Sequence, residues 1–395
     1  MIRSIKSFDL KGQTILMRLD LNVPIEDDKI KDDFRLRACL PTINYCLDEG
    51  ASIVIMSHLG RPEGKYNKNY SLISVGESLA SMLEIPIKFS DDCISQDAID
   101  TSLSLKAGEV HLLENLRFYK EEQDNNPDFS NRLSRHGKLF INDAFGTAHR
   151  KHSSNFGVVN NFKYYGIGIL VENELRYLKE MMNKPKRPLV VLIGGAKVST
   201  KIELIKRFLH LADSIIIGGG MAFTFFKAMG YNTGNSLVES EMVKNARSII
   251  DLARSIGKEL ILPVDTICSE SFGGKPFEKA LSVRELTNNI MGLDIGPKSI
   301  ELFNNIIDSA STVIWNGPMG VFENNFYSNG TRLIGENLSN IADNGVNVIV
   351  GGGDTSAALR HFNLMKNITH ISTGGGSSLE LMSGNNLVAL ERLEV

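Results

Sequence analysis

The stretch VVLIGGAK, residues 190–197, joins a short run of β-branched and aliphatic residues directly to a pair of glycines. The same pattern recurs in the second half of the chain as SIIIGGG (214–220), TVIWNGPMG (312–320), VNVIVGGGD (346–354) and ITHISTGGG (368–376). Short β-branched runs followed by loops and helical patterns are typical of parallel strands in an α/β fold. We therefore expect two doubly wound, Rossmann-like parallel sheets, one in each half of the chain.

The apolar runs of the first half end in cations instead of glycines. They are ILMRLDLN (15–22), IVIMSHLGR (53–61), VHLLENLRF (110–118) and KLFINDAFGTAHR (138–150), while ELILPVD (259–265) is the exception in the second half. Ligands of open α/β sheets bind at the carboxyl ends of the strands. One half therefore presents side-chain cations and the other presents backbone N–H groups, which predicts two phosphorylated ligands on two domains that meet across a cleft.

The length of 395 residues favours two domains, because single cores stop growing near about 250–300 residues. Between the halves, the segment VENELRYLKEMMNKPKRP (171–188) is charged and helical in pattern, and Pro185 and Pro188 stop it. We expect this segment to be a hinge helix, with the domain boundary near Val171. Apolar periodicity also predicts helices in 32–50, 71–85, 201–213 and 240–258.

The composition argues against several classes of function. The 43 basic and 46 acidic residues give a net charge of −3, which shows no bias toward nucleic acid or an anionic membrane. No apolar stretch approaches the roughly 20 residues of a membrane span, and the polar opening MIRSIKSFDLKGQ is unlike a signal peptide. The cysteines have no C-x-x-C or metal-ligand spacing, which fits a reducing compartment; they are Cys39, Cys46, Cys93 and Cys268. We expect a cytoplasmic protein that binds neither nucleic acid nor membrane.

The familiar catalytic and nucleotide-binding fingerprints are missing. No G-x-x-x-x-G-K-[ST] loop occurs, and no glycine cluster continues as G-x-G-x-x-G, which weakens the alternative of a nicotinamide-dependent dehydrogenase. Neither G-x-S-x-G nor H-E-x-x-H is present, and no paired carboxylates stand out. Cations and backbone amides without an acid–base pair suit transfer between groups that are already ionised. A non-catalytic nucleotide-binding protein or scaffold is a further alternative, although it has no physical need for unpaired cations in a cleft.

Each feature of the second half has a functional and a plainer explanation. Glycines 194–195, 218–220, 351–353 and 374–376 let the backbone approach a phosphate or a base, yet one such loop can simply make a tight turn. Lys197 and Lys201 are expected on one face just inside a helix, where an anion offsets their unfavourable interaction with the helix dipole. Surface solvation is the plainer explanation. Asp354 can cap a helix or hold Mg²⁺, and the two uses are compatible.

Seven cations near strand ends or helix starts form a candidate anion-binding patch in the first half: Arg18, Arg35, His58, Arg61, Arg117, His149 and Arg150. Arginine binds phosphate or carboxylate through two parallel hydrogen bonds, although any single arginine can equally form a surface ion pair. Asp20 and Asn22 follow the first apolar run and suit hydroxyl groups on the same ligand. A strand-terminal aspartate can also cap a turn.

Taken together, the motifs resemble the phosphoglycerate kinase family, in its order and over essentially the whole chain. They are RLDLNVP (18–24), DDFRLRA (32–38), SHLGRP (57–62), LLENLRF (112–118), FGTAHRKHSS (145–154), GGAKVSTK (194–201), GGGMAFTF (218–225), WNGPMGVFE (315–323), GGGDT (351–355) and STGGGSSLE (372–380). Such a series of long motifs is very specific. The departures are Lys151, where the family usually has a small residue, and the variant segment PVDTICSESF (263–272).

The resemblance implies a monomeric enzyme of glycolysis and gluconeogenesis with Mg²⁺ as its cofactor. Its reaction would be reversible phosphoryl transfer from 1,3-bisphosphoglycerate to ADP, which gives 3-phosphoglycerate and ATP by direct in-line transfer after domain closure. The resemblance also implies a phosphoglycerate-binding domain of residues 1–170 plus 384–395, a hinge helix 171–188 and a nucleotide-binding domain 189–383.

The functional residues of the family, carried onto matching positions, form three sets. The set that would hold the glycerate is Asp20, Asn22, Arg35, His58, Arg61, Arg117, His149 and Arg150. The set that would stabilise the transferring phosphoryl group is Arg35, Lys197, Gly374, Gly375 and Gly376. The set that would bind the nucleotide, with Asp354 as the Mg²⁺ ligand, is Gly195, Ala196, Lys201, Gly219, Gly220, Asn316, Pro318, Glu323, Gly352, Gly353, Asp354 and Thr355.

Overall fold

The computed structural model describes residues 2–394, and the chain divides into two compact units. The first unit runs to Arg176 and resumes at Asn386, and the second spans Tyr177–Asn385. The resemblance implied the bounds 1–170 plus 384–395 and 189–383, with 171–188 as a separate hinge. In the structure the two units divide the segment 171–188 between them, and the later boundary lies between Asn385 and Asn386.

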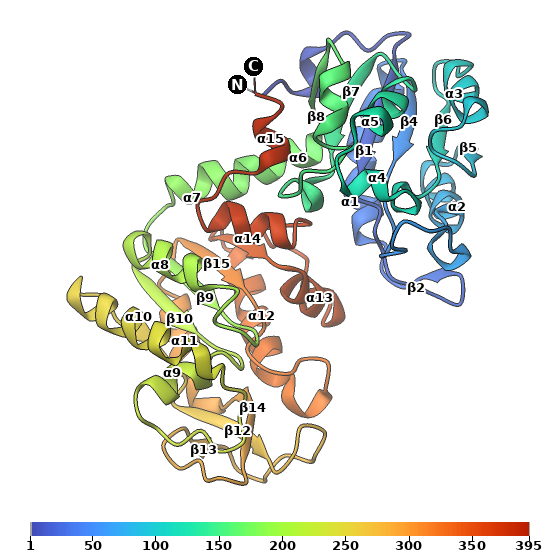
Figure 1. The fold of residues 1–395 in the computed structure, drawn as a ribbon. Helices are drawn as coiled ribbons and strands as arrows, with labels where there is room; N and C mark the ends of the chain where they lie inside the picture. Colours follow the sequence, from blue (N-terminus) through green and yellow to red (C-terminus); the bar gives the residue numbers. More distant parts are fainter. Residues whose placement is uncertain (1, 395) are drawn as a thin grey trace. The chain divides into compact units, whose positions relative to one another are not determined.

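A parallel sheet forms the centre of the first unit (Figure 1). Neighbouring strands pair in parallel in the order β5 (Ile87–Ser90), β6 (Val110–Leu113), β4 (Ser52–Met56), β1 (Thr14–Leu19), β7 (Leu139–Asp143), β8 (Tyr165–Ile167). Strands β4, β6 and β7 are buried along their whole length. Strands of parallel sheets that are buried on both faces read as continuous apolar runs, so these strands were visible in the sequence.

Helices cover this sheet and bury their apolar stripes in its core. In α1, Leu36, Cys39, Ile43 and Cys46 are buried at helical spacing, and Gly50 follows with a φ of 77°, which suits glycine at the end of a helix. The predicted helices 32–50 and 71–85 are confirmed as α1 and α2. The helices are α1 (Phe34–Asp48), α2 (Ile73–Leu83), α3 (Gln96–Leu103), α4 (Lys120–Gln123), α5 (Pro127–Ser134) and α6 (Ile169–Leu175), and a short hairpin joins β2 (Ile25–Glu26) to β3 (Lys29–Ile30).

The end of the chain returns to the first unit. Figure 1 shows the red helix α15 (Val388–Glu391) beside green α6, with the two chain ends close together. The backbone N–H of Ala389 donates to the carbonyl of Ala148 at 3.0 Å, and Ile2 forms an antiparallel bridge with Glu394. Leu393 is fully buried. The segment that begins at Asn386 is therefore part of the packed structure of this unit.

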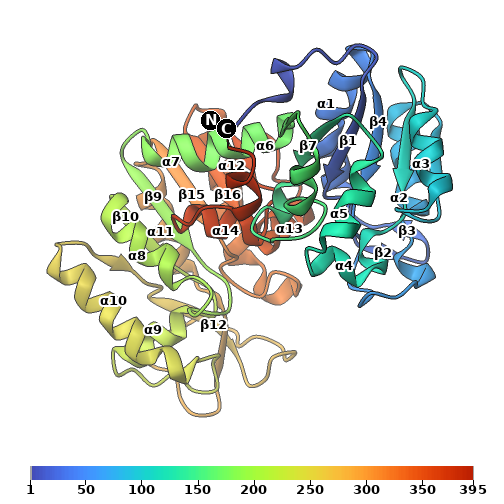
Figure 2. The ribbon, with the colours of Figure 1, turned by 45° about the horizontal axis from the view of Figure 1, so that its top comes forward.

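The second unit has a parallel sheet of its own, and Figure 2 shows β9, β15 and β16 side by side. Its order is β11 (Leu260–Ile261), β10 (Ser214–Ile217), β9 (Leu189–Ile193), β15 (Thr312–Asn316), β16 (Asn347–Gly351), β17 (His370–Ile371). Phe303, Trp315 and Leu338 are buried in the core on one side of this sheet. The expected fold class, two Rossmann-like α/β sheets, is confirmed.

Helices flank the second sheet, and a small antiparallel sheet is added beside it. The helices are α7 (Met181–Asn183), α8 (Ile202–Leu211), α9 (Ala222–Ala228), α10 (Val243–Ser255), α11 (Pro297–Ile307), α12 (Asn329–Asp343), α13 (Gly353–His361) and α14 (Gly376–Met382). The predicted helices 201–213 and 240–258 correspond to α8 and α10. The antiparallel sheet has the order β13 (Leu281–Ser282), β12 (Asp265–Ser269), β14 (Met291–Ile295), and the sequence analysis did not anticipate it.

The segment expected to be a hinge helix, 171–188, is helical over most of its length. Helix α6 continues into a π-helical turn, Arg176–Glu180, and then into α7, which ends at Asn183. Pro185 and Pro188 follow the last helical residue, as their lack of an N–H donor requires. π-helical turns are rare insertions into α-helices, and nothing in the sequence pattern indicated this one.

Candidate functional site

The predicted glycerate-binding residues gather at one end of the first sheet. Strands β6, β4, β1 and β7 are adjacent and parallel, so their carboxyl ends lie at the same edge. Asp20 and Asn22 follow β1, His58 and Arg61 follow β4, Arg117 follows β6, His149 and Arg150 follow β7, and Arg35 lies in the first turn of α1. The topology therefore brings together side chains that are more than a hundred residues apart in sequence.

Hydrogen bonds tie the loops of this edge to one another. Arg35 Nη1 donates to the carbonyl of Asn22 at 2.8 Å and lies 3.3 Å from Asp20 Oδ1. Asn22 Oδ1 accepts from the N–H of Gly60 at 2.8 Å, and Arg117 Nη1 donates to the Gly60 carbonyl at 2.6 Å. Hydrogen bonds thus join the loops after β1, β4 and β6 to one another.

The cations of the cluster repel one another, and one of them has donors that are unpaired within residues 2–394. Burial lowers the pKa of Arg117 to about 10, and repulsion from Arg150 and Arg18 adds to that fall. The Nε and Nη2 atoms of Arg117 are buried and have no hydrogen-bond partner among the described residues. An unpaired buried donor costs about 1–3 kcal/mol, and more when it is charged. A bound anion would supply the missing acceptors.

Arg18 does not belong to the ligand-contacting surface, and the expectation that it does is wrong. Its side chain is 1% exposed. Its Nε donates to Ser154 Oγ at 2.7 Å, its Nη1 donates to the Leu19 carbonyl, and its Nη2 lies 3.1 Å from His58 Nδ1. Strand β1 carries this arginine into the interior, where each of its three side-chain nitrogens has a partner. It supports the cluster from behind.

His149 and Arg150, after β7, are hydrogen-bonded to each other, whereas Arg61, after β4, is exposed. Arg150 Nε donates to His149 Nε2 at 3.2 Å, so the His149 ring faces its neighbour through that nitrogen. Arg61 is exposed. Arg61 is therefore accessible from solvent, whereas Arg117 and His58 are buried.

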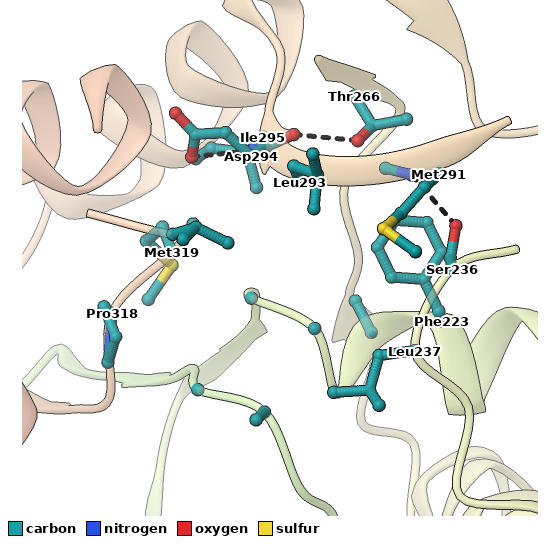
Figure 3. Close-up of a pocket in the computed structure, with 18 of the residues that line it drawn as sticks. Phe223, Ser236, Leu237, Thr266, Met291, Leu293, Asp294, Ile295, Pro318 and Met319 are labelled. Atoms are coloured by element: carbon teal, nitrogen blue, oxygen red, sulfur yellow. Dashed lines mark hydrogen bonds between the residues drawn. The ribbon is translucent and has the colours of Figure 1, made fainter. Parts of the chain in front are cut away.

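A cavity of about 540 Å³ lies in the second unit (Figure 3). Seven of the predicted nucleotide-binding residues line it, namely Gly195, Ala196, Gly219, Gly220, Pro318, Glu323 and Asp354. Five others lie outside this lining, namely Lys201, Asn316, Gly352, Gly353 and Thr355. Thr355 is fully buried and its hydroxyl oxygen accepts from the N–H of Gly317 at 2.7 Å. The structure places it behind the loops that meet at the cavity.

Backbone hydrogen bonds and close packing join the glycine loops to one another. The N–H of Gly194 donates to the Asn316 carbonyl at 2.9 Å, and that of Gly195 to the Pro318 carbonyl at 2.7 Å. Gly219 has a φ of 65°, and a Cβ atom there would lie 2.5 Å from the N of Gly195. Close packing between loops is therefore one physical reason for glycine here, in addition to close approach by a ligand.

Lys197 and Lys201 are not in a helix, contrary to the prediction, because α8 begins only at Ile202. Lys197 is exposed on the loop. Lys201 Nζ donates to the carbonyls of Gly194 at 2.7 Å and Asn316 at 2.9 Å. Burial lowers the pKa of Lys201 to about 8. The two lysines thus differ: one is a free cation and the other braces the loops after β9 and β15.

The residues around Asp354 fit a Mg²⁺ ion bound together with phosphates. Gly352 is the N-cap of α13 and no side chain caps this helix, so the expectation that Asp354 acts as the N-cap is wrong. The Asp354 carboxylate is exposed at the cavity wall. Within residues 2–394 no cluster of three or more His, Cys, Asp or Glu side chains could hold a metal alone. Mg²⁺ is commonly bound by one or two carboxylates plus substrate phosphates and water, which this single carboxylate permits.

Sequence analysis missed the apolar wall of the cavity. Figure 3 shows Met291 and Leu293 on β14, the Phe223 ring beside Met291, and Leu237 below that ring. The only available signal was the aromatic content of AFTFFKA (222–228), which is equally typical of a buried helix. Asp294 stands at the same wall and accepts from the N–H of Gly330 at 2.7 Å.

The loops before the last helix of the second unit complete the set of predicted sites. Gly374, Gly375 and Gly376 lead from β17 into α14, which begins at Gly376. Gly375 has a φ of 50°, and a Cβ atom there would meet nothing within 4 Å. Unlike Gly219, this glycine faces open space, where close approach by another group is possible.

A family model described as phosphoglycerate kinase matches residues 5–385. The chain belongs to the phosphoglycerate kinase family. It is 43% identical over 392 residues to a phosphoglycerate kinase of Chlorobium phaeobacteroides, with 99% of both chains covered. It is also 43% identical over 394 residues to that of Borrelia garinii subsp. bavariensis, which covers 100% of this chain and 99% of the relative.

Solved structures of the phosphoglycerate kinase family share the fold. The enzyme from Coxiella burnetii matches with a TM-score of 0.88 and 36% identity over 100% of this chain and 99% of its own. The enzyme from Pyrococcus horikoshii matches with a TM-score of 0.87 and 31% identity over 100% and 98%. These findings confirm the family, the fold class and the kinase activity that the motif resemblance implied. No helix within residues 2–394 is long and apolar enough to cross a membrane.

Proposed function

We propose that the chain catalyses reversible, Mg²⁺-dependent phosphoryl transfer between 1,3-bisphosphoglycerate and ADP, which gives 3-phosphoglycerate and ATP. One observation carries this proposal. A chain of the phosphoglycerate kinase family has a cation cluster in which two Arg117 nitrogens lack hydrogen-bond partners in the described part of the chain, and in its second unit an apolar cavity edged by glycine loops. Residues 1–170 plus 384–395 are assigned to the glycerate, 189–383 to the nucleotide, and 171–188 to the hinge.

The glycerate site is proposed at the cation cluster. The unpaired Nε and Nη2 of Arg117 support binding of a phosphate or carboxylate there, since arginine pairs such groups with two hydrogen bonds. Arg61 is exposed and adds a solvent-accessible cation. His149 and Arg150 follow the neighbouring strand, and Asp20 and Asn22 suit the hydroxyl group of the same ligand.

The nucleotide site is proposed at the cavity of the second unit. Its volume and its apolar wall suit a base, because ligand sites are mostly apolar with a few polar groups that fix orientation. Glu323 supplies a carboxylate at the lining. Lys201, which is hydrogen-bonded to the loops after β9 and β15, is proposed to contact the phosphates. Asp354 would hold Mg²⁺, which neutralises phosphate charge when it is bound.

Transfer needs positioning and charge neutralisation and does not need a base, because the glycerate carboxylate is already ionised. The transferring group spreads negative charge over three equatorial oxygens. Arg35, Lys197 and the amides of Gly374–Gly376 are proposed to stabilise that charge. In-line attack requires reacting atoms about 3–3.5 Å apart, so we propose that the domains close during each cycle and exclude water.

A coupled assay tests the proposed reaction. Purified protein receives ATP, Mg²⁺ and 3-phosphoglycerate, and an NADH-oxidising dehydrogenase consumes the acyl phosphate product. NADH loss that needs phosphoglycerate and stops with EDTA supports the reaction and its metal requirement. ATP binding without NADH loss would favour a non-catalytic nucleotide-binding protein, and absence of ATP binding would refute the assignment of the second unit.

The cytoplasm, the monomeric state and a place in glycolysis and gluconeogenesis belong to the same proposal. The buried free thiols support a reducing compartment. Sedimentation of the purified protein at micromolar concentration checks the monomer, for which a mass of 43.6 kDa is expected. Absence of NAD binding at millimolar concentration would separate this enzyme from a dehydrogenase.

A further inference from the structure

A chain of buried hydrogen bonds lies behind the cation cluster of the first unit and ends at His58. It starts at Glu122 in α4, whose side chain is 0% exposed. Ser154 donates to both carboxylate oxygens, from its N–H at 2.9 Å and from its hydroxyl at 2.6 Å. The hydroxyl of serine carries one hydrogen. Because that hydrogen goes to Glu122, Ser154 Oγ can only accept from its other neighbour.

Arg18 is the donor to Ser154, and the same guanidinium determines the state of His58. Arg18 Nε lies 2.7 Å from Ser154 Oγ, and Arg18 Nη2 lies 3.1 Å from His58 Nδ1. A guanidinium has five N–H donors and no acceptor, so His58 Nδ1 must accept. In a neutral imidazole the hydrogen then resides on Nε2.

The His58 ring is neutral as well as oriented. Burial holds the pKa of His58 well below its ordinary value, and the charges of Arg18 and Arg117 lower it further. A neutral ring with the wrong tautomer would present a lone pair to an anionic ligand, which is repulsive. The Nε2–H tautomer presents a donor instead.

Glu122 faces Arg18 from beneath the cluster. Burial raises the pKa of its carboxyl group, and attraction to Arg18 and the hydrogen bonds from Ser154 oppose that rise. Burial lowers the pKa of Arg18, and attraction to Glu122 opposes that fall. His152 Nδ1 lies 3.9 Å from Glu122 Oε1, but burial lowers the pKa of His152 to about 3, so the two form no ion pair at neutral pH. Arg18 is therefore the cation that Glu122 and Ser154 hold in place.

We propose that Glu122 and Ser154 are positioning residues: they aim Arg18 at His58 and hold that imidazole as the neutral Nε2–H tautomer, a donor to an oxygen of the phosphoglycerate. The proposal rests on the proposed function, because the acceptor is the glycerate substrate. Glu122, Ser154 and Arg18 are buried behind the cluster, so the role assigned to them is exerted through His58.

The test reads the tautomer directly. The whole protein, labelled with ¹⁵N in its eight histidines, is examined without substrate by long-range ¹H–¹⁵N spectroscopy, and the His58→Gln variant assigns the signal. Wild-type His58 is expected to show a protonated Nε2 and an unprotonated Nδ1. Ser154→Ala is expected to show a mixture of tautomers and a KM for 3-phosphoglycerate raised about tenfold, the size expected when one hydrogen bond to a charged group is lost, with the KM for ATP unchanged.

Ser153→Ala is the matched control. Ser153 is as buried as Ser154, but its hydroxyl donates to the Glu121 carbonyl at 2.7 Å and lies outside the chain of hydrogen bonds to His58. It is expected to lower the thermal midpoint comparably and to leave the His58 signal and both KM values unchanged.

Either of two results would overturn the proposal, and the first needs no variant with altered stability. The first is a wild-type His58 with its hydrogen on Nδ1, which would refute the tautomer assignment in the unmodified protein. The second is equal effects of Ser153→Ala and Ser154→Ala on the KM for phosphoglycerate. Since the tautomer is read without substrate, an Nε2–H ring in a protein that does not bind phosphoglycerate would refute the proposed function itself, and with it this role.

Discussion

The lowered pKa of Lys201 predicts that nucleotide binding weakens in alkaline solution. Burial brings this pKa to about 8, so the ammonium is present below that pH and is lost above it. The charged fraction falls from about nine-tenths at pH 7 to about one-tenth at pH 9. If only the charged form binds the phosphates, the apparent Kd is divided by that fraction, and it rises about tenfold between the two pH values.

Calorimetric titration with Mg-ADP at pH 7, 8 and 9 and constant ionic strength measures this effect. The phosphates contribute little to the change, because their last ionisation lies near pH 6. Lys201→Met keeps an unbranched side chain and removes the titrating amine, so it is expected to bind more weakly at every pH with a flat profile. A flat profile in the wild type, or the same slope in Lys201→Met, would refute the reasoning.

Other substitutions separate the proposed roles. Lys197→Ala is expected to lower kcat about 10²-fold with small changes in either KM, and an unchanged kcat in steady-state assays would contradict a role in transfer. Arg61→Ala is expected to raise the KM for 3-phosphoglycerate about tenfold and to leave that for ATP unchanged; equal weakening of both would contradict the domain assignment. Gly219→Ala is expected to cost about 1–3 kcal/mol and to lower the thermal midpoint more than Gly230→Ala, whose added Cβ meets nothing within 4 Å; equal midpoints would contradict the packing argument. Leu237→Ala, at the cavity, is expected to weaken Mg-ADP binding about five- to tenfold, and unchanged calorimetric affinity would place the base elsewhere.

The strands and long helices were predictable because burial patterns are local in sequence. The apolar run at 190–193 forms β9, and the periodic segment 32–50 contains α1. The glycine and cation endings also indicated correctly which end of each sheet carries the candidate residues, since parallel strands share an edge.

Predictions failed where contacts between distant segments decide the outcome. Lys201 was expected on a helix face, yet carbonyls from the loops after β9 and β15 hold its amine outside the helix. Arg18 was expected at the ligand, yet Ser154 and His58 use its donors in the interior. Phe223 and Leu237 could not be recognised as cavity residues, because apolar residues that line a cavity and those that fill a core have the same pattern in sequence.

Because the chain returns to its first unit, that unit cannot complete its packing during synthesis until the second unit has been translated. Domains generally fold as they emerge, the N-terminal one first. Here the segment from Asn386 onward is translated after the whole of Tyr177–Asn385, and it supplies buried Leu393 and the hydrogen bond from Ala389 to Ala148, next to His149. On the ribosome the second unit is therefore the first whose residues are all available, and the cation-bearing unit stays incomplete until the final residues of that segment leave the exit tunnel.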